Sequence, residues 1–349
     1  MRTAFSSERL GTEDRAVGIG ERGDYSAAML RSRSIALLSL TLLILAGCGG
    51  KAPIRLQLNW SPEPEFGGFY AAEHEGLFAK EGLDVEIVTG GPNVPVPQLA
   101  ASGKVEFAVI AAPQLLTLRE QGGDLIALYA VFQGNPMGLM VHEASPHKTL
   151  SELWMSEATV SIENGLTDFR WLDKAYPGGK RKIVPYSSNL GAFAADPKLV
   201  SQCFFTSEPI SLEQQGIKTR VFLIGESGFD PYNAIVVTTK SYYAAHPEEC
   251  RKFVRAVAAG WRSYLNQPAA IHEHMHTLNP ALTTAAMARI FEVQKRLVET
   301  DTTRQLGLGC MTEPRWQTLT EQLLALGLSQ KKPDAASLFV WDATAGTAR

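Results

Sequence analysis

Short apolar runs alternate with polar segments from residue 54 onward. Ile54, Leu56 and Leu58 alternate with polar residues, which predicts a strand. Apolar residues at helical spacing follow and end at Gly82, which predicts a helix. Further runs predict strands over 83–88, 105–110, 125–132, 158–163, 182–187, 220–225 and 234–239, with a helix over 113–121. This alternation predicts an α/β fold built on mostly parallel sheets.

The pattern becomes helical from residue 241 onward. In the segment 246–267, Pro247 stands in the first turn of a predicted helix, and Phe253, Val257, Trp261 and Leu265 share one face of it. The segments 282–299 and 313–327 have the same character. Since no low-complexity linker interrupts residues 54–340, we expect two lobes joined by strands instead of a flexible tether.

The N-terminal region has the features of a secretion signal. Residues 35–46 form an almost wholly apolar run behind Arg31 and Arg33, too short to cross a bilayer as a stable helix. The run ends in LAGC, which matches the bacterial lipobox and predicts a lipid on Cys48. The alternative is an ordinary signal peptide with an incidental cysteine. We expect residues 1–47 to be a leader and signal peptide, followed by a lipid-anchored linker over 48–53.

The start of the chain is open to a second interpretation. Residues 1–28 contain five acidic residues, whereas the leading segment of a signal is normally short and basic. Met29 is therefore an alternative first residue.

Composition argues against nucleic acid as a partner and limits the number of disulfide bonds. The chain has 349 residues with a formal net charge of -3, which provides no broad basic surface for nucleic acid. With Cys48 lipidated, Cys203, Cys250 and Cys310 allow at most one disulfide within the chain. No cysteine spacing indicates a metal site.

One histidine pair has metal-ligand spacing. His272 and His276 would share a helix face at i and i+4, as the metal-binding histidines of metalloprotease helices do. No glutamate stands where such an enzyme needs it, so a solvated helix is the favoured interpretation. The glycine pairs at 90–91 and 122–123 match neither a dinucleotide fingerprint nor a P-loop, and no GxSxG motif supports a hydrolase.

The densest aromatic and acidic group follows the first predicted strand and consists of Trp60, Glu63, Glu65, Phe66 and Tyr70. Ligands of open α/β sheets bind outside the carboxyl ends of strands. Pro62 and Pro64 make the loop rigid, so Trp60 is expected to present its indole face to a flat ligand. Tyr70 is equally consistent with packing in a helix core.

Two later segments offer similar candidates. Glu208 precedes Pro209 just beyond an apolar strand, where it would accept hydrogen bonds from a ligand or cap the following helix. Asp230 and Tyr232 precede the strand at 234–239, where they would contact a ligand or form the turn before Asn233.

Three stretches resemble the solute-binding lipoproteins of ABC importers for thiamine-pyrimidine precursors, riboflavin, sulfonates and nitrate: residues 58–87, 204–217 and 309–328. The resemblance spans residues 54–328. It implies the type 2 periplasmic binding protein fold, two α/β lobes joined by crossing strands near 137–143 and 233–239, with a ligand cleft between the lobes. Lobe one would be 54–139 plus 236–340, lobe two 140–235, and the tail 341–349.

The resemblance also implies roles for particular residues. Trp60 and Tyr70 match the aromatic positions of the pyrimidine binders, and Glu208 matches their acidic position. Phe66 stands where related eukaryotic pyrimidine synthases have a substrate histidine, so synthase chemistry is not expected. The positions that correspond to ligand-contacting turns are Ala111, Gln114, Asn164 and Gly165.

Stacking aromatics beside acids favour a nitrogen-rich heterocycle such as an aminopyrimidine or a flavin ring. A sulfonate or nitrate ligand would need cationic donors, and Arg170 is one candidate. We expect an exported, lipid-anchored, monomeric solute-binding protein that passes a small molecule to a permease and its ATPase, without catalysis, cofactor or metal. The alternatives are a sulfonate or nitrate binder, an exported enzyme assisted by metal at His272 and His276, and a sensor input domain.

Overall fold

The structure is a computed structural model, and it describes residues 52–187 and 189–341. The expected signal segment, the alternative start at Met29, the lipidation site Cys48 and the tail after Trp341 lie outside the described residues. Within residues 52–187 and 189–341, no helix combines the length and the apolar character needed to cross a membrane.

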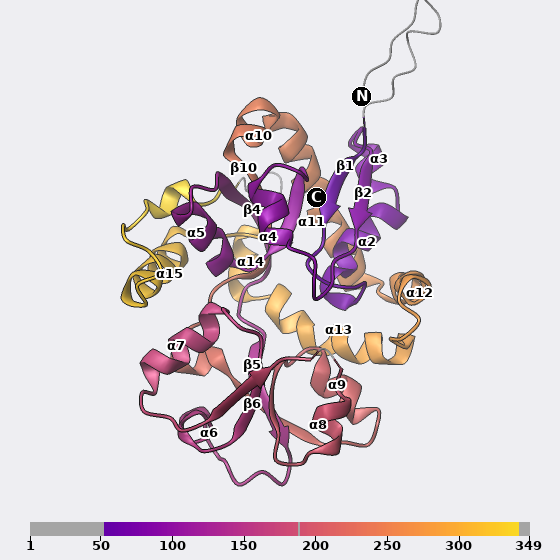
Figure 1. Cartoon of the computed structure of the whole chain (residues 1–349). Coiled ribbons are helices and arrows are strands. Elements are labelled where there is room, and N and C mark those ends of the chain that lie inside the picture. Colours follow the sequence, from indigo (N-terminus) through magenta and orange to yellow (C-terminus); the bar gives the residue numbers. More distant parts are fainter. Residues whose placement is uncertain (1–51, 188, 342–349) are drawn as a thin grey trace, which may run out of the picture. The chain divides into compact units, whose positions relative to one another are not determined.

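Two five-stranded sheets form the framework of the fold (Figure 1). The first has the order β2-β1-β3-β10-β4. Its strands are β1 (Ile54–Gln57), β2 (Val85–Val88), β3 (Phe107–Ile110), β4 (Leu125–Phe132) and β10 (Asn233–Thr239). The second sheet has the order β7-β6-β8-β5-β9. Its strands are β5 (Met137–His142), β6 (Thr159–Ile162), β7 (Lys182–Pro185), β8 (Val200–Phe204) and β9 (Thr219–Leu223). The predicted α/β fold with two lobes is therefore confirmed.

The prediction of mostly parallel sheets is wrong, because both sheets are mixed. β1 pairs in parallel with β2 and β3, whereas β10 runs antiparallel to β3 and β4. In the second sheet β6 is parallel to β7 and β8, and β5 is antiparallel to β8 and β9. β5 and β10 are the strands that enter from the other lobe. Each of these two strands starts at the edge of the sheet where its two neighbouring strands end. It therefore runs antiparallel to both neighbours.

Helices cover both sheets (Figure 1). The chain up to β10 contains α2 (Gly67–His74), α3 (Leu77–Lys80), α4 (Val96–Ala101), α5 (Ala112–Glu120), α6 (Leu150–Met155), α7 (Thr167–Ala175), α8 (Gly191–Ala195) and α9 (Glu208–Glu213). The C-terminal part contains α10 (Lys240–Ala245), α11 (Pro247–Asn266), α12 (Ala269–Leu278), α13 (Thr284–Val298), α14 (Asp301–Leu306) and α15 (Glu313–Ala325). Short 3-10 helices are η1 (Pro64–Phe66), η2 (Ile224–Ser227) and η3 (Ala335–Ser337). The helical C-terminal part agrees with the sequence pattern.

The close packing of α2 on α11 explains the glycine pair before Phe69. A Cβ atom added at Gly68 would lie 2.2 Å from the ring of Trp261, and one added at Gly260 would lie 2.2 Å from the carbonyl oxygen of Gly68. Trp261 and Phe253 on α11 are fully buried, as their shared helix face predicts. These glycines allow the two backbones to approach, which places the loop before α2 against the lobe-one core.

Two connections join the sheets, residues 133–136 between β4 and β5 and residues 228–232 before β10. Asn135 links them, because its backbone N–H donates to Oδ1 of Asp230 at 2.6 Å. Its side-chain amide donates to Oδ1 of Asp168, at the start of α7, at 2.6 Å. α13 packs against both η1 and α9. The predicted lobe boundaries, 54–139 plus 236–340 and 140–235, stay a proposal, and they fall inside β5 and β10, a few residues after the two connections.

Candidate functional site

Three carboxyl groups from both lobes meet near the ends of β1 and β8, and we call Glu63, Glu65 and Glu208 the carboxyl cluster. Glu63 and Glu65 are 8% and 7% exposed, and Glu208 is half-buried. Oε2 of Glu63 accepts a hydrogen bond of 3.0 Å from the hydroxyl of Ser207. Glu208 accepts bonds from the Tyr186 hydroxyl at 2.9 Å and from the backbone N–H of Phe204 at 2.8 Å. Groups from β1, β7 and β8 therefore converge here.

The loop that carries Glu63 and Glu65 is held by its backbone carbonyls. Pro64 occupies the first turn of η1, where its missing N–H is not needed. The carbonyl of Pro62 accepts a hydrogen bond from the Asn279 side chain at 2.9 Å, and that of Pro64 accepts one from Gln294 at 2.7 Å. Both glutamates are thus presented by a fixed backbone.

Burial and mutual repulsion govern the electrostatics of the carboxyl cluster. Burial, reinforced by the nearby Glu208, raises the pKa of Glu63 to about 8. Burial also raises the pKa of Glu65 well above its usual value, with added repulsion from Glu63 and Glu208. The pKa of Glu208 is raised by burial, although its hydrogen bonds from Tyr186 and Phe204 oppose the shift.

The carboxyl cluster lacks a counter-ion. In the described part of the chain, no ion pair joins any of its three carboxyl groups to Lys, Arg or His. Oε1 of Glu65 and Oε1 of Gln294 are buried without a hydrogen-bond partner. Buried acceptors without partners are costly and are suited to a ligand that donates N–H groups or carries positive charge.

Trp60 lies at the start of the same loop. Its side chain is half-buried and packs against the lobe-one core, and its carbonyl accepts the N–H of Gly90 at 2.9 Å. The indole therefore retains some exposed surface, as a stacking residue requires. Its contact with a ligand stays a prediction.

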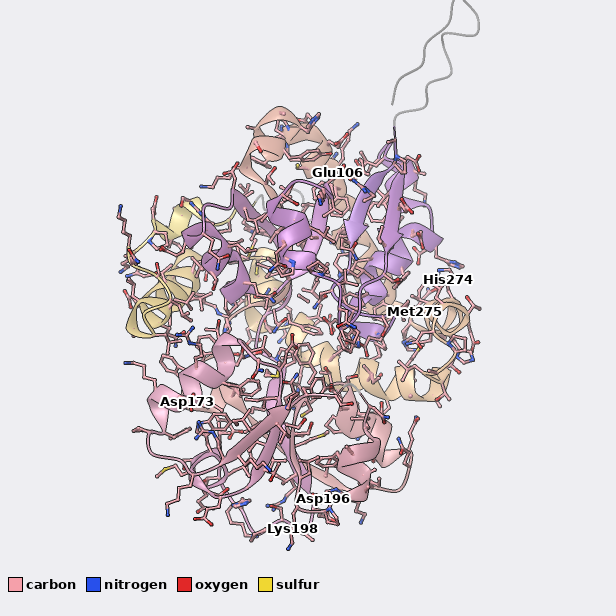
Figure 2. The ribbon with its side chains drawn as sticks, in the orientation of Figure 1. Glu106, Asp173, Asp196, Lys198, His274 and Met275 are labelled. Atoms are coloured by element: carbon pink, nitrogen blue, oxygen red, sulfur yellow. The ribbon has the colours of Figure 1, made fainter. Side chains whose placement is uncertain are left out.

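Phe66 and Tyr70 are placed in the core of lobe one. Phe66 is fully buried and Tyr70 is 2% exposed. The ring of Tyr70 lies 6.0 Å from that of His274 on α12, a residue labelled in Figure 2. The Tyr70 hydroxyl has no hydrogen-bond partner, and burial raises its pKa. A ligand would reach either ring only if neighbouring side chains moved, so their stacking role remains a prediction.

The turn residues expected at the cleft occupy two separate strand ends. Ala111 caps α5, and its N–H donates to Oε1 of Gln114 at 2.9 Å. Both are half-buried. Asn164 and Gly165 are exposed between β6 and α7, and Gly165 has a positive φ of 88°. Across the described residues, no side-chain hydrogen bond joins these four to the carboxyl cluster, so their participation is still a prediction.

Asp230 and Tyr232 belong to the second connection between the sheets. Asp230 is exposed, accepts the N–H of Asn135, and has Oδ2 3.8 Å from the Arg315 guanidinium. Tyr232 is buried, and its hydroxyl accepts the N–H of Thr312 at 3.0 Å. Arg315 lies over the Tyr232 ring at 4.0 Å. Both residues therefore anchor this connection to the start of α15.

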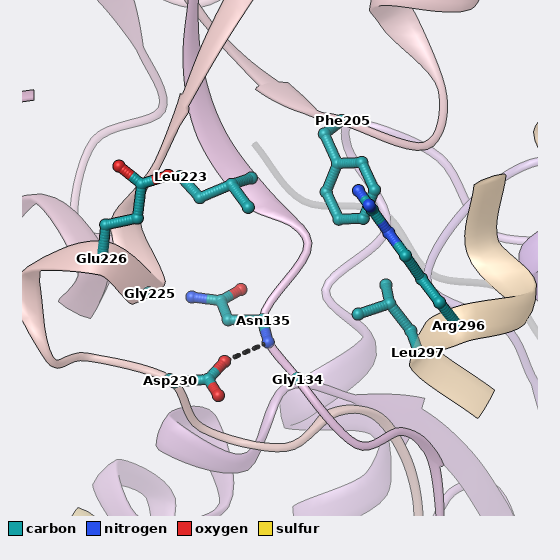
Figure 3. Close-up of a pocket in the computed structure, with 9 residues that line it drawn as sticks. All are labelled: Gly134, Asn135, Phe205, Leu223, Gly225, Glu226, Asp230, Arg296 and Leu297. Atoms are coloured by element: carbon teal, nitrogen blue, oxygen red, sulfur yellow. Dashed lines mark hydrogen bonds between the residues drawn. The ribbon is translucent and has the colours of Figure 1, made fainter. Parts of the chain in front are cut away.

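A cavity of about 430 Å³ lies beside the connections (Figure 3). Its volume is within the range of small-molecule sites. The guanidinium of Arg296 covers Phe205 at 4.6 Å, and Asp230 lines the same cavity. The lining consists of Gly134, Asn135, Phe205, Leu223, Gly225, Glu226, Asp230, Arg296 and Leu297. Phe205 places this cavity next to the turn that carries Ser207 and Glu208.

The sequence pattern did not identify Tyr186, Ser207 or Asn135. Tyr186 lies inside the strand predicted over 182–187, whereas β7 ends at Pro185, so a polar aromatic side chain near a strand end was an available signal. Ser207 stands directly before α9, where its type suggests helix capping, yet its hydroxyl bonds Glu63. Asn135 gave no local signal, because its partners lie in distant segments.

The histidine pair does not converge. Nε2 of His272 hydrogen-bonds the Tyr264 hydroxyl at 2.9 Å, and Nδ1 of His276 bonds the carbonyl of Leu282 at 2.9 Å. Among the residues that the structure describes, no group of three or more His, Cys, Asp or Glu side chains is placed to hold a metal ion. The cysteines Cys203, Cys250 and Cys310 are free and buried.

Comparison with known proteins agrees with this architecture. The riboflavin-binding protein RibY of Chloroflexus aurantiacus is 22% identical over 346 residues, covering 89% of this chain and 97% of that protein. A formylaminopyrimidine-binding protein of Halalkalibacterium halodurans is 31% identical over 111 residues, covering 29% of this chain and 33% of that protein. The structure of the periplasmic aliphatic sulphonate binding protein SsuA of Escherichia coli matches with a TM-score of 0.60 at 14% identity, covering 84% of this chain and 93% of that one.

The family comparison confirms the resemblance read from the sequence. The two-lobed fold is that of the periplasmic binding proteins. The match to the family described as NMT1/THI5 like extends over residues 63–271, more than half of the chain. The chain therefore belongs to the NMT1/THI5-like family.

Proposed function

We propose that this chain is the extracytoplasmic solute-binding component of an ABC importer and captures a small nitrogen-rich aromatic molecule between its lobes. The observation that carries the proposal is the carboxyl cluster, to which lobe one contributes Glu63 and Glu65 and lobe two contributes Glu208. Lobe closure would bury the ligand and favour the form that a permease recognises. The chain performs no reaction in this proposal.

The chemistry of the carboxyl cluster favours a donor-rich heterocycle. An amino-substituted pyrimidine or a flavin offers N–H groups to carboxyl oxygens and a flat face to Trp60. The names of two relatives, a riboflavin binder and a formylaminopyrimidine binder, agree with this class. In the proposed site Trp60 stacks, Glu65 and Glu208 accept hydrogen bonds, and Asn164 and Asp230 orient the ligand.

The sulfonate or nitrate alternative rests on one cation. Arg296 lines the cavity and would supply a donor to an anion. Its guanidinium already lies over Phe205, and Arg170, the other candidate, is exposed. An anion would need cationic donors, and the carboxyl cluster has no cation paired with it among the described residues, so this alternative ranks second.

The cellular setting is also a proposal. The apolar segment at 35–46 and the LAGC sequence support export and a lipid on Cys48, which would attach a monomer to the membrane. The periplasmic location named for SsuA agrees with export. The permease and its ATPase would be the protein partners.

A thermal-shift panel on the chain without residues 1–48 tests the proposal. The panel contains 4-amino-5-hydroxymethyl-2-methylpyrimidine, formylaminopyrimidine, riboflavin, an alkanesulfonate, nitrate and zinc. A ligand at about a hundred times its Kd adds roughly 2.7 kcal/mol to the free energy of unfolding. We expect stabilisation by one heterocycle class and its loss in Glu208→Gln, with Glu213→Gln, an exposed carboxyl on the same helix, as the matched control. Stabilisation by sulfonate alone supports the anion binder, and a response to zinc alone supports the enzyme.

A further inference from the structure

The carboxyl cluster brings acids of both lobes together, and its two lobe-one members are almost wholly shielded from water. Glu63 and Glu65 are more than nine-tenths buried, and Ser207 on the lobe-two side bonds Glu63 at 3.0 Å. Oε1 of Glu65 and Oε1 of Gln294 are buried and unpartnered, and Gln294 is held against η1 through the carbonyl of Pro64. Acceptors are therefore in excess of donors at this point.

The cations on the elements packed around the carboxyl cluster are engaged elsewhere. On α13, Arg289 and Lys295 pair with Glu213 and Glu299 at 3.8 and 3.5 Å, and Arg296 covers Phe205. On β9, Arg220 donates to the carbonyls of Ser145 and His147. On α2, His74 lies beside His274, with ring centroids 5.0 Å apart.

Two cations stand on the strands that end here: Lys182 is exposed at the opposite end of β7 from Tyr186, and Arg55 on β1 pairs with Glu106 at 3.6 Å. The other titratable groups supply no positive charge; they are Glu73 and Tyr70 on α2, Glu292 on α13, Glu213 on α9, Cys203 on β8 and Tyr186 after β7. The Tyr186 hydroxyl donates a hydrogen bond to Glu208. Burial raises the pKa of both Tyr186 and Cys203, and the nearby Glu208 raises it further. Protons on the carboxyl groups themselves are the remaining means of relieving the repulsion.

We infer that the unliganded carboxyl cluster stores protons, and that a ligand displaces them as its N–H groups or its positive charge enter the site. The inference rests on the proposed function, since it takes the carboxyl cluster as the place where ligand binds. The displaced protons pass to the solvent, and the ligand's own N–H bonds remain intact. Each carboxyl exchanges an O–H bond for an N–H···O⁻ hydrogen bond.

Thermodynamic linkage predicts the direction in which ligand affinity changes with pH. The pKa of Glu63, raised to about 8, means that its carboxyl group is largely protonated at neutral pH without ligand, and burial shifts the pKa of Glu65 in the same direction. A ligand that requires carboxylates therefore binds more tightly as pH rises, by about tenfold per pH unit for each proton released. An anionic ligand would bind more weakly over the same range.

Calorimetric titration with 4-amino-5-hydroxymethyl-2-methylpyrimidine, in phosphate and in Tris at equal pH, measures the released protons. The probe's own protonation is recorded separately and subtracted. We expect an apparent binding enthalpy that differs between the buffers and a Kd that falls about tenfold when the pH rises by one unit, if one proton leaves. Equal enthalpies in both buffers with a Kd independent of pH would overturn the inference and leave the proposed function standing.

A measurement without ligand tests the stored protons independently. The folded pKa of Glu63 is raised to about 8, so its contribution to stability is fully present below its unfolded pKa of 4.5 and is lost as pH rises toward 8. We expect the Tm of the wild type to fall across this range relative to Glu63→Gln and, in a second variant, to Glu65→Gln. Glu213→Gln is the exposed control. Parallel plots of Tm against pH for the wild type and both variants would overturn the inference, even if no compound of the thermal-shift panel binds. Absence of stabilisation by every panel compound, with the Tm profiles as expected, would count against the proposed function alone.

Discussion

The hydroxyl of Ser207, at the start of α9, donates a hydrogen bond of 3.0 Å to Oε2 of Glu63, 144 residues earlier in the chain. The bond lies between a lobe-one loop and a lobe-two helix, so it exists only while the two lobes face each other closely. It also opposes the rise in the Glu63 pKa that burial causes. One hydroxyl therefore takes part in both the contact between the lobes and the protonation of the site.

Replacing this hydroxyl should weaken the contact between the lobes. We expect Ser207→Ala to lower the free energy of unfolding by about 1 kcal/mol, because a buried carboxyl loses a partner. Ser211→Ala, one turn further along α9, is the matched control. Chemical denaturation measures both variants, and equal stability of the two would show that the Ser207 bond contributes nothing.

Trp60 should contribute to ligand affinity through stacking. Trp60→Ala is expected to weaken binding of a heterocycle by roughly 1 to 3 kcal/mol, the range for one stacked ring. Trp60→Phe retains an aromatic face and should recover part of the affinity. Calorimetry on correctly folded variants measures the effect. An unchanged affinity in Trp60→Ala would assign the indole to packing.

His272 should make the protein sensitive to acid. Burial lowers its pKa to about 4, below the ordinary 6.5, so the unfolded chain binds a proton that the folded chain does not. Stability should fall as pH drops from 6.5 toward 4, by up to about 1.4 kcal/mol per pH unit. His272→Gln, which can still bond Tyr264, should lose this dependence, whereas the exposed control His246→Gln should keep it. An acid profile of His272→Gln identical to that of the wild type would contradict the assignment.

Ala234 has a strained backbone where β10 begins. Its φ is 48°, a left-handed conformation that costs a non-glycine residue about 1 to 2 kcal/mol. Ala234→Gly should therefore change the free energy of unfolding by less than about 1 kcal/mol, since relieved strain offsets added chain entropy. Ala234→Val should cost at least about 2 kcal/mol, because the site is fully buried and a branched side chain tolerates this φ poorly. Ala108→Gly on β3 is the control, and chemical denaturation measures both variants. A larger loss in the free energy of unfolding for Ala234→Gly than for Ala108→Gly would show that the Ala234 backbone is not strained.

Tyr232 distinguishes an anchoring role from a ligand contact. Tyr232→Phe removes the hydroxyl that accepts the Thr312 N–H, and we expect a loss of about 1 kcal/mol in stability with little change in affinity. Chemical denaturation measures the change in stability of Tyr232→Phe, and calorimetry measures its change in ligand affinity. Weaker binding at unchanged stability would make Tyr232 a ligand residue.

Most of the secondary structure followed from local patterns. The alternation from Ile54 and the apolar face of α11 predicted elements that the structure contains, because burial of one face imposes a period on the chain itself. The direction of β5 and β10 within their sheets did not follow, because a crossing strand has the same local pattern whichever way it pairs.

The candidate site was likewise predictable only in part from the sequence. The sequence by itself determined that Glu63 and Glu65 stand in the Pro-containing loop after the first predicted strand and that Glu208 stands shortly after an apolar segment. It could not determine that Glu63 bonds Ser207, that Tyr186 bonds Glu208, or that Tyr70 packs toward His274. Only the tertiary structure decided these relationships, because burial and pKa depend on groups that are far apart in the chain and are brought together by packing of the two lobes.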